Sequence, residues 1–158
     1  MKIILGSDKS GFLLKEAIKA YFDEANIDYE DIGTQDIEQP KPFFIVAPIA
    51  AKMIQENPER KAILLCGTGM GMAQVATKYH GILAACCESV YAARMCRAVN
   101  NSNILTMGGW VIGPEMGLEM VKAFLSTDHT QGLEEWRQEF LKNAVLKVNE
   151  IDSENRKG

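Results

Sequence analysis

The sequence predicts an α/β protein in which helices cover both faces of a five-stranded parallel sheet. Segments with the composition of buried strands alternate with segments of helical periodicity along the chain of 158 residues. The strand segments 2–6, 61–66 and 82–87 are nearly continuous apolar runs, which is typical of parallel strands covered on both faces. Because no repeat or linker interrupts this alternation, we expect one domain over residues 1–150, followed by a frayed tail at 151–158.

The first half of the chain contains three strands and three helices. Four large apolar residues recur at near-helical spacing within 10–25, namely Phe12, Leu14, Ile18 and Phe22. Ser10 precedes them as a candidate N-cap, and the helix over 43–56 ends before Pro58, which lacks the N–H needed to continue it. The expected strands are 2–6, 28–32 and 61–66, and the expected helices are 10–25, 43–56 and a segment ending near 78.

The second half continues the alternation and ends in a long helix. The expected strands are 82–87 and 103–107, and the expected helices are 89–99, 114–126 and 133–150. The last helix is amphipathic, with an apolar side formed by Trp136, Phe140, Val145 and Val148. In such folds ligands bind where the carboxyl ends of the strands meet, so function should be sought in the segments that follow the strands.

Composition and charge exclude several classes of function. The net charge of −4 and the lack of a lysine or arginine stripe disfavour a nucleic-acid partner. No apolar run approaches the ~20 residues that span a membrane, and the N-terminal segment is typical of a first strand, so we expect a cytoplasmic location. The four cysteines form no C-x-x-C pair and the two histidines are isolated, so we expect neither a metal nor another cofactor.

The turn "CGTGMGM", residues 66–72, is the motif most suggestive of chemistry. A dinucleotide fingerprint would need a third glycine where Met72 stands, and a P-loop would need Lys followed by Ser or Thr after its last glycine. Three interpretations remain open. Cys66 and the turn's N–H groups could remove a carbon-bound proton and stabilise the resulting oxyanion, or the segment could be a tight turn beside a buried thiol. The turn could also have another binding role, such as holding a phosphate on its N–H groups.

Three segments resemble the type B ribose-5-phosphate isomerase family, which includes the galactose-6-phosphate isomerase subunits. They are "KIILGSDKSGFLLKEAI", "ILLCGTGMGMAQVATKYHGILAA" and "NNSNILTMGGWVIG", and the resemblance runs from about residue 2 to residue 150. It implies a Rossmann-like three-layer sandwich that forms homodimers or tetramers with active sites shared between subunits. It also implies aldose–ketose isomerisation of a small sugar phosphate through a cis-enediol or its enediolate, without metal or other cofactor.

The resemblance also assigns roles to particular residues. Cys66 matches the residue that moves the proton between C1 and C2, and Asp8 matches the acid that binds sugar hydroxyls. Thr68 and the amides of four neighbours match the loop that stabilises the enediolate; these neighbours are Gly67, Gly69, Met70 and Gly71. Asn100 matches the asparagine after the ring-opening histidine, and Lys9 with Arg137 is expected to meet the phosphate.

Several positions depart from the family pattern. The ring-opening histidine falls at Val99, and two phosphate-binding arginines fall at Trp110 and Leu133. Because valine cannot move a proton, we expect a short sugar phosphate that cannot close a stable ring, such as a tetrose phosphate. Two alternatives remain: a subunit whose paralogous partner chain supplies the missing histidine and arginines, and a non-catalytic relative that binds sugar phosphates.

Overall fold

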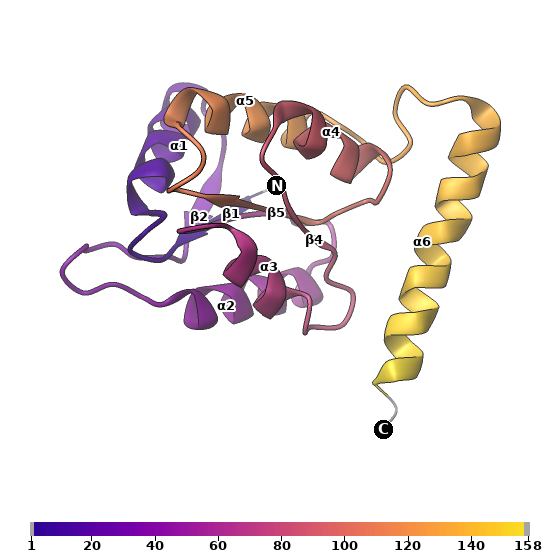
Figure 1. Cartoon of the computed structure of the whole chain (residues 1–158), viewed down its shortest axis with the longest axis horizontal. Coiled ribbons are helices and arrows are strands. Elements are labelled where there is room, and N and C mark those ends of the chain that lie inside the picture. Colours follow the sequence, from indigo (N-terminus) through magenta and orange to yellow (C-terminus); the bar gives the residue numbers. More distant parts are fainter. Residues whose placement is uncertain (1, 157–158) are drawn as a thin grey trace.

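The computed structural model describes residues 2–156, and its centre is a fully parallel five-stranded sheet (Figure 1). The strands are β1 (Ile3–Ser7), β2 (Tyr29–Asp31), β3 (Ala62–Cys66), β4 (Ala84–Cys86) and β5 (Ile104–Gly108). Their order across the sheet is β2-β1-β3-β5-β4. The strand β2 therefore lies on one side of β1, and the later strands β3, β5 and β4 extend from its other side. The predicted fold class and the order of the elements are confirmed.

Helices form a layer on each face of the sheet. Figure 1 shows α1 (Phe12–Glu24), α4 (Val90–Ala98) and α5 (Pro114–Leu125) on one face, and α2 (Phe43–Glu56) and α3 (Met70–Ala76) on the other. Successive strand residues point to opposite faces, so Leu5 joins the core under Phe22 and Phe124, whereas Ile4 joins the core under Val46. Every residue of β1, β3 and β5 is buried, which explains their apolar runs.

The last helix, α6 (Glu135–Asn155), stands beside the sandwich rather than on either layer (Figure 1). It extends to Asn155, beyond the expected end at residue 150, because its last turns are anchored to the loop between α3 and β4. Asp152 accepts hydrogen bonds from His80 Nδ1 at 2.7 Å and from the N–H of Gly81 at 2.9 Å, and Arg156 donates to the carbonyl of Lys78. Residues 157–158 of the expected tail lie outside the described part of the chain.

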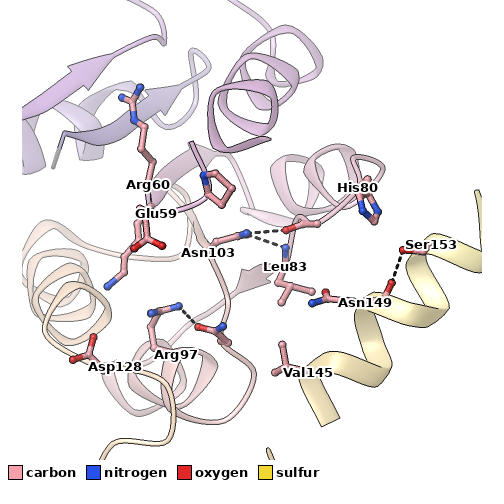
Figure 2. A pocket seen from close by; sticks show the side chains of 14 residues that line it. Glu59, Arg60, His80, Leu83, Arg97, Asn103, Asp128, Val145, Asn149 and Ser153 are labelled. Atoms are coloured by element: carbon pink, nitrogen blue, oxygen red, sulfur yellow. Dashed lines mark hydrogen bonds between the residues drawn. The ribbon is translucent and has the colours of Figure 1, made fainter. Parts of the chain in front are cut away.

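The predicted apolar side of α6 is largely exposed in the single chain. Trp136 is 70% exposed and Phe140 is 64% exposed, and Val148 is exposed as well. Between α6 and the amino ends of the strands lies a cavity of about 530 Å³ (Figure 2). The buried guanidinium of Arg97 lies at this cavity and donates to Asn101 Oδ1 at 3.0 Å and to the carbonyl of Ser102 at 2.7 Å. The lining of this cavity is therefore largely polar.

The start of α1 differs from the expected one. The helix begins at Phe12 with Gly11 as its N-cap, not at Ser10. The Oδ1 atom of Asp8 accepts hydrogen bonds from the N–H groups of Ser10 at 2.8 Å and of Gly11 at 3.0 Å. These amides lie two and three residues after Asp8, so Asp8, and not Ser10, caps the turn that leads into α1.

Candidate active site

The turn after β3 places the thiol of Cys66 against backbone amides. Cys66 is the last residue of β3 and is buried, and its Sγ atom accepts a hydrogen bond from the N–H of Gly69 at 3.1 Å. Gly69 has a φ of +79°, a left-handed conformation that glycine adopts without strain, and it forms the N-cap of α3. This conformation folds the chain back so that one N–H group points at the sulfur.

Other polar groups of the turn are free to meet a ligand. The N–H groups of Thr68 and Gly71 donate to no acceptor within residues 2–156. The N–H of Met70 donates to Oγ1 of Thr68 at 3.3 Å and so helps to hold that hydroxyl in place. A thiol next to unpaired donors is the arrangement required to remove a carbon-bound proton and stabilise the oxyanion that results.

Asp8 and Lys9 leave the sheet next to Cys66. Ser7 pairs with Leu65 across β1 and β3, and the N–H of Asp8 donates to the carbonyl of Leu65 at 3.0 Å. Burial raises the pKa of Asp8, while the hydrogen bonds from Gly11 and Ser10 oppose that shift. Only Oδ1 takes part in these bonds, so Oδ2 is open to a substrate hydroxyl. Lys9 is exposed beside this carboxylate.

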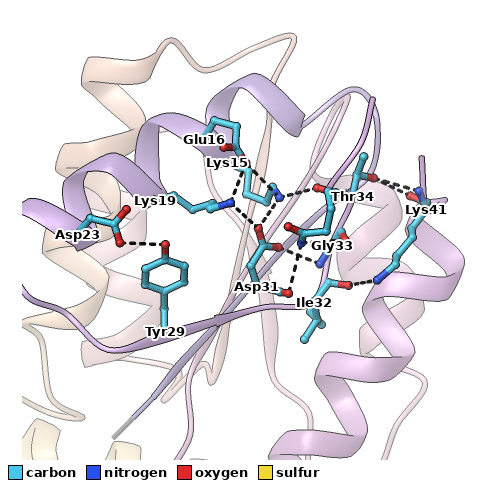
Figure 3. A network of polar contacts seen from close by, with 11 residues as sticks. Lys15, Glu16, Lys19, Asp23, Tyr29, Asp31, Ile32, Gly33, Thr34 and Lys41 are labelled. Atoms are coloured by element: carbon cyan, nitrogen blue, oxygen red, sulfur yellow. Dashed lines mark hydrogen bonds and ion pairs between the residues drawn. The ribbon is translucent and has the colours of Figure 1, made fainter. Parts of the chain in front are cut away.

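A buried ion pair holds the neighbouring loop in place (Figure 3). The ammonium group of Lys15, which is 0% exposed, contacts Asp31 and donates to the carbonyl of Thr34. Burial alone would raise the pKa of Asp31, but the hydrogen bond and charge of Lys15 lower it. The N–H of Thr34 donates to the carbonyl of Ser7 at 2.9 Å. The network therefore fixes the loop after β2 against the end of β1, immediately before Asp8.

Two aromatic rings line the glycine turn. A methyl group added at Gly67 would lie 2.8 Å from three atoms of the Trp110 ring, and one added at Gly71 would lie 3.1 Å from the Phe43 ring. The glycines thus allow both rings to lie directly on the backbone of the turn. Phe43 is not predicted as part of the site, because only its position at the start of α2 brings it there.

Cys86 is a second residue that the sequence analysis missed. It ends β4 and its Sγ atom lies 3.6 Å from the carbonyl oxygen of Thr68. Burial raises the pKa of Cys86, so this group remains a protonated donor towards the turn. Its position at the carboxyl end of a strand was the only available signal.

Asn100 and Arg137 lie away from Cys66. Asn100 follows α4 and lines a cavity of about 350 Å³ with Val99 and residues of α6. This part of the chain lies at the amino edge of the sheet. The carbonyl of the neighbouring Asn103 accepts a hydrogen bond from the N–H of Ala62, the first residue of β3. Ala62 begins β3 and Cys66 ends it, so the length of this strand separates the two edges by ~13 Å. Arg137 lies at the start of α6. Because Asn100 and Cys66 lie at opposite edges, one chain does not bring all predicted site residues together.

The part of the chain that the structure describes contains neither a metal cluster nor a membrane-spanning helix. Among residues 2–156, no group of three or more His, Cys, Asp or Glu side chains is arranged to hold a metal ion. Within that same range, none of the helices is both long enough and apolar enough to cross a membrane. The cavity beside Arg97 contains none of the predicted site residues.

Comparison with known proteins places the chain among the aldose–ketose isomerases. It belongs to the ribose/galactose isomerase family, whose sequence model matches residues 3–140. It is 60% identical over 159 aligned residues to a 4-deoxy-4-sulfo-D-erythrose isomerase of Clostridium sp. (strain MSTE9), with all of both chains covered. It is 33% identical to a D-erythrulose-4-phosphate isomerase of Pectobacterium atrosepticum, over 84% of this chain and 87% of that one.

The fold agrees with solved structures of the same family. Ribose-5-phosphate isomerase B of Clostridium thermocellum superposes with a TM-score of 0.87 at 31% identity, over 98% of this chain and 99% of that one. The family resemblance inferred from the sequence is therefore confirmed, and the chain is an isomerase of the aldose–ketose class.

Proposed function

We propose that this enzyme interconverts a four-carbon aldose bearing a sulfonate at C4 and the corresponding ketose. The full-length similarity to a 4-deoxy-4-sulfo-D-erythrose isomerase supports this substrate. The proposal depends on the residue at position 99. Val99 stands where the family resemblance implies a ring-opening histidine, and its side of the chain lines a mostly apolar cavity.

The chemistry of the substrate explains why valine is sufficient there. A tetrose closes a furanose ring only through its C4 hydroxyl. When C4 carries a carbon–sulfur bond instead, no ring can form and no group is needed to open one. A tetrose 4-phosphate is also open-chain, because its C4 oxygen is esterified, and it is the second candidate because of the similarity to a D-erythrulose-4-phosphate isomerase.

Cys66 is proposed as the base of the reaction. Its thiolate removes the proton from C2 of the aldose, and the electron pair moves through C1 to give an enediolate. The N–H groups of Thr68 and Gly71 stabilise the oxyanion, because neither has an acceptor within residues 2–156. The proton then returns at C1, while the proton of the C2 hydroxyl passes to the C1 oxygen, which completes the ketose. The carboxylate of Asp8 orients the hydroxyls.

A second copy of the chain is proposed to complete each site. Asn100 lies at the amino edge of the sheet and Arg137 belongs to α6, which stands beside the sandwich, whereas Cys66, Asp8 and Lys9 lie at the carboxyl edge. An assembly that sets these edges against one another would unite them, and the exposed apolar side of α6 offers a surface for it. A paralogous partner chain would meet the same geometric need. The cytoplasmic location expected from the sequence stays a prediction.

The test uses the purified chain alone in D₂O. With 4-deoxy-4-sulfo-D-erythrose we expect the ketose to form and to carry deuterium at C1, because the thiol exchanges its proton with solvent. We expect ribose 5-phosphate, which must first open its ring, to react at least ~100-fold more slowly. Equal rates on ribose 5-phosphate would refute the argument from Val99, and activity that requires an added paralogue would establish the hetero-oligomer instead.

A further inference from the structure

The indole of Trp110 is fixed next to the reacting centre although it is 74% exposed. The six-membered part of the ring lies on Gly67, where an added methyl group would be 2.8 Å from Cδ2, Cε3 and Cζ3. The N–H of Trp110 donates to the carbonyl of Gly67 at 3.0 Å, and the N–H of Gly109 donates to that of Cys66 at 2.7 Å. The ring is therefore held by the backbone of the residues that carry the thiol.

The charge around this edge of the sheet is unfavourable to a dianion. The loops that follow the five strands are 8–11, 32–42, 67–69, 87–89 and 109–113. They contain two lysines, Lys9 and Lys41, and four acidic residues, Asp8, Asp36, Glu38 and Glu88. Lys41 donates to the carbonyl of Ile32 at 3.1 Å. The other lysine of these loops, Lys9, is exposed and forms no side-chain hydrogen bond or ion pair within residues 2–156.

We propose that Trp110 is a specificity-determining residue that makes the site select a singly charged anionic group over a doubly charged one. An indole offers one N–H donor and no positive charge. Lys9 is the cation that this chain provides, and Arg137 of a second copy would add one more. A sulfonate carries one negative charge, whereas a phosphate ester carries between 1.5 and 2 at about pH 7. The second charge would meet an apolar ring at Trp110, at an edge of the sheet whose loops contain four acidic residues and two lysines, which is unfavourable. This inference rests on the proposed function and extends it from the carbon skeleton to the terminal group.

The first experiment separates charge from size with the wild-type enzyme. The C4 sulfonate of the tetrose is compared with the C4 phosphonate, which has the same length but two negative charges at about pH 8. We expect kcat/KM for the sulfonate to exceed that for the phosphonate by about tenfold, and the gap to narrow as the pH falls and the phosphonate gains a proton. Equal or better turnover of the phosphonate at the higher pH would overturn the inference.

The second experiment tests Trp110 itself. Trp110→Arg introduces a cation at an exposed position, so we expect the sulfonate-to-phosphonate ratio of kcat/KM to fall by about tenfold. Trp110→Phe keeps an uncharged ring on Gly67, and the ratio should stay within about twofold of wild type. A ratio that is unchanged in the arginine variant, or that changes equally in both variants, would refute the assignment. The ratio is informative even where both rates fall.

Failure of this inference is distinguishable from failure of the proposed function. If the wild-type enzyme does not isomerise the sulfonate, the proposed function is wrong. If it does isomerise the sulfonate but shows no preference for the single charge, only the role of Trp110 is wrong. Inhibition constants of the unreactive four-carbon alditols bearing each group measure the preference independently of turnover.

Discussion

The sulfur of Cys66 accepts a hydrogen bond from the N–H of Gly69, three residues further along the chain, at 3.1 Å. This contact joins the end of β3 to the start of α3 and holds the thiol over the turn. It makes the chemistry of Cys66 depend on the backbone conformation of Gly69, and both residues can be tested separately.

Cys66→Ser is expected to lower kcat by about 10²–10⁴-fold, because a hydroxyl is far harder to ionise than a thiol and cannot act as the base. The side chains are similar in size, so the free energy of unfolding should change little. The matched control is Cys86→Ser, which keeps a donor towards Thr68 and should retain kcat within about tenfold. Full activity of Cys66→Ser in steady-state assays would remove this thiol from the mechanism.

Gly69→Ala is expected to lower both stability and turnover. The left-handed φ of +79° strains an alanine, and its Cβ atom would lie 2.8 Å from the backbone of Met107 and 3.0 Å from the sulfur of Cys86. We expect a loss of about 2–4 kcal/mol in the free energy of unfolding, measured with urea.

Gly81→Ala provides the control for this substitution. Gly81 has a similar φ of +74°, but an added methyl group there meets no atom within 4 Å. Its cost should be limited to about 1 kcal/mol of backbone strain, without an effect on kcat. Equal losses in the two variants would show that crowding at Gly69 does not matter.

Complementation between two inactive variants tests the shared site. Cys66→Ser damages the carboxyl edge and Arg137→Ala damages the start of α6, so a mixed dimer would hold one site with both defects and one intact site. After co-refolding of equal amounts, random pairing should restore about a quarter of wild-type activity. If both residues act within one chain, mixing will restore nothing.

Lys15→Met is expected to destabilise the protein by about 3 kcal/mol, because it leaves the carboxylate of Asp31 in a half-buried place without its main partner. Lys19→Met removes a more exposed lysine that lies 3.1 Å from the same carboxylate. This control should cost less than about 1 kcal/mol. Urea unfolding of the two variants measures the difference.

The same pair predicts a dependence of stability on pH. The pKa of Asp31 is lowered in the folded protein from the usual 3.8. Its contribution is therefore complete above the unfolded pKa and is lost as the pH falls through the folded pKa. Below about pH 4 we expect the wild-type protein to lose stability more steeply than Lys15→Met, in which the pKa of Asp31 is lowered less. Parallel curves would show that Lys15 does not shift this pKa.

Much of the fold could be predicted from the sequence because its strands are buried on both faces. Apolar runs such as 61–66 mark them clearly, and glycine and proline mark the ends of several elements. The start of α1 could not be predicted exactly, because Ser10 and Asp8 are both residue types that cap helices, and only the structure shows that Asp8 accepts from the amides two and three residues later. The length of α6 depends on a tertiary contact between Asp152 and His80.

The candidate site could be predicted only in part. Cys66, Thr68 and Asp8 follow neighbouring strands, so sequence position alone brings them to one edge. The ring of Phe43 reaches the turn only through the packing of α2, which no local pattern reveals. Asn100 lies at the opposite edge because α4 runs antiparallel to the strands. The register of β3 and β5 shows this separation, because Ala62, four residues before Cys66, pairs with Ile104 and its N–H donates to the carbonyl of Asn103.

The placement of Cys66 and Asn100 at opposite ends of one sheet has a consequence for how activity depends on enzyme concentration. In a dimer that unites them by two-fold symmetry, the two sheets run in opposite directions. The Cys66 edge of each chain then meets the Asn100 edge of the other, so the dimer contains two complete sites. A dissociated chain then carries both halves but no complete site. Specific activity would fall on dilution as chains separate, and substrate that binds across the contact would hold the pair together.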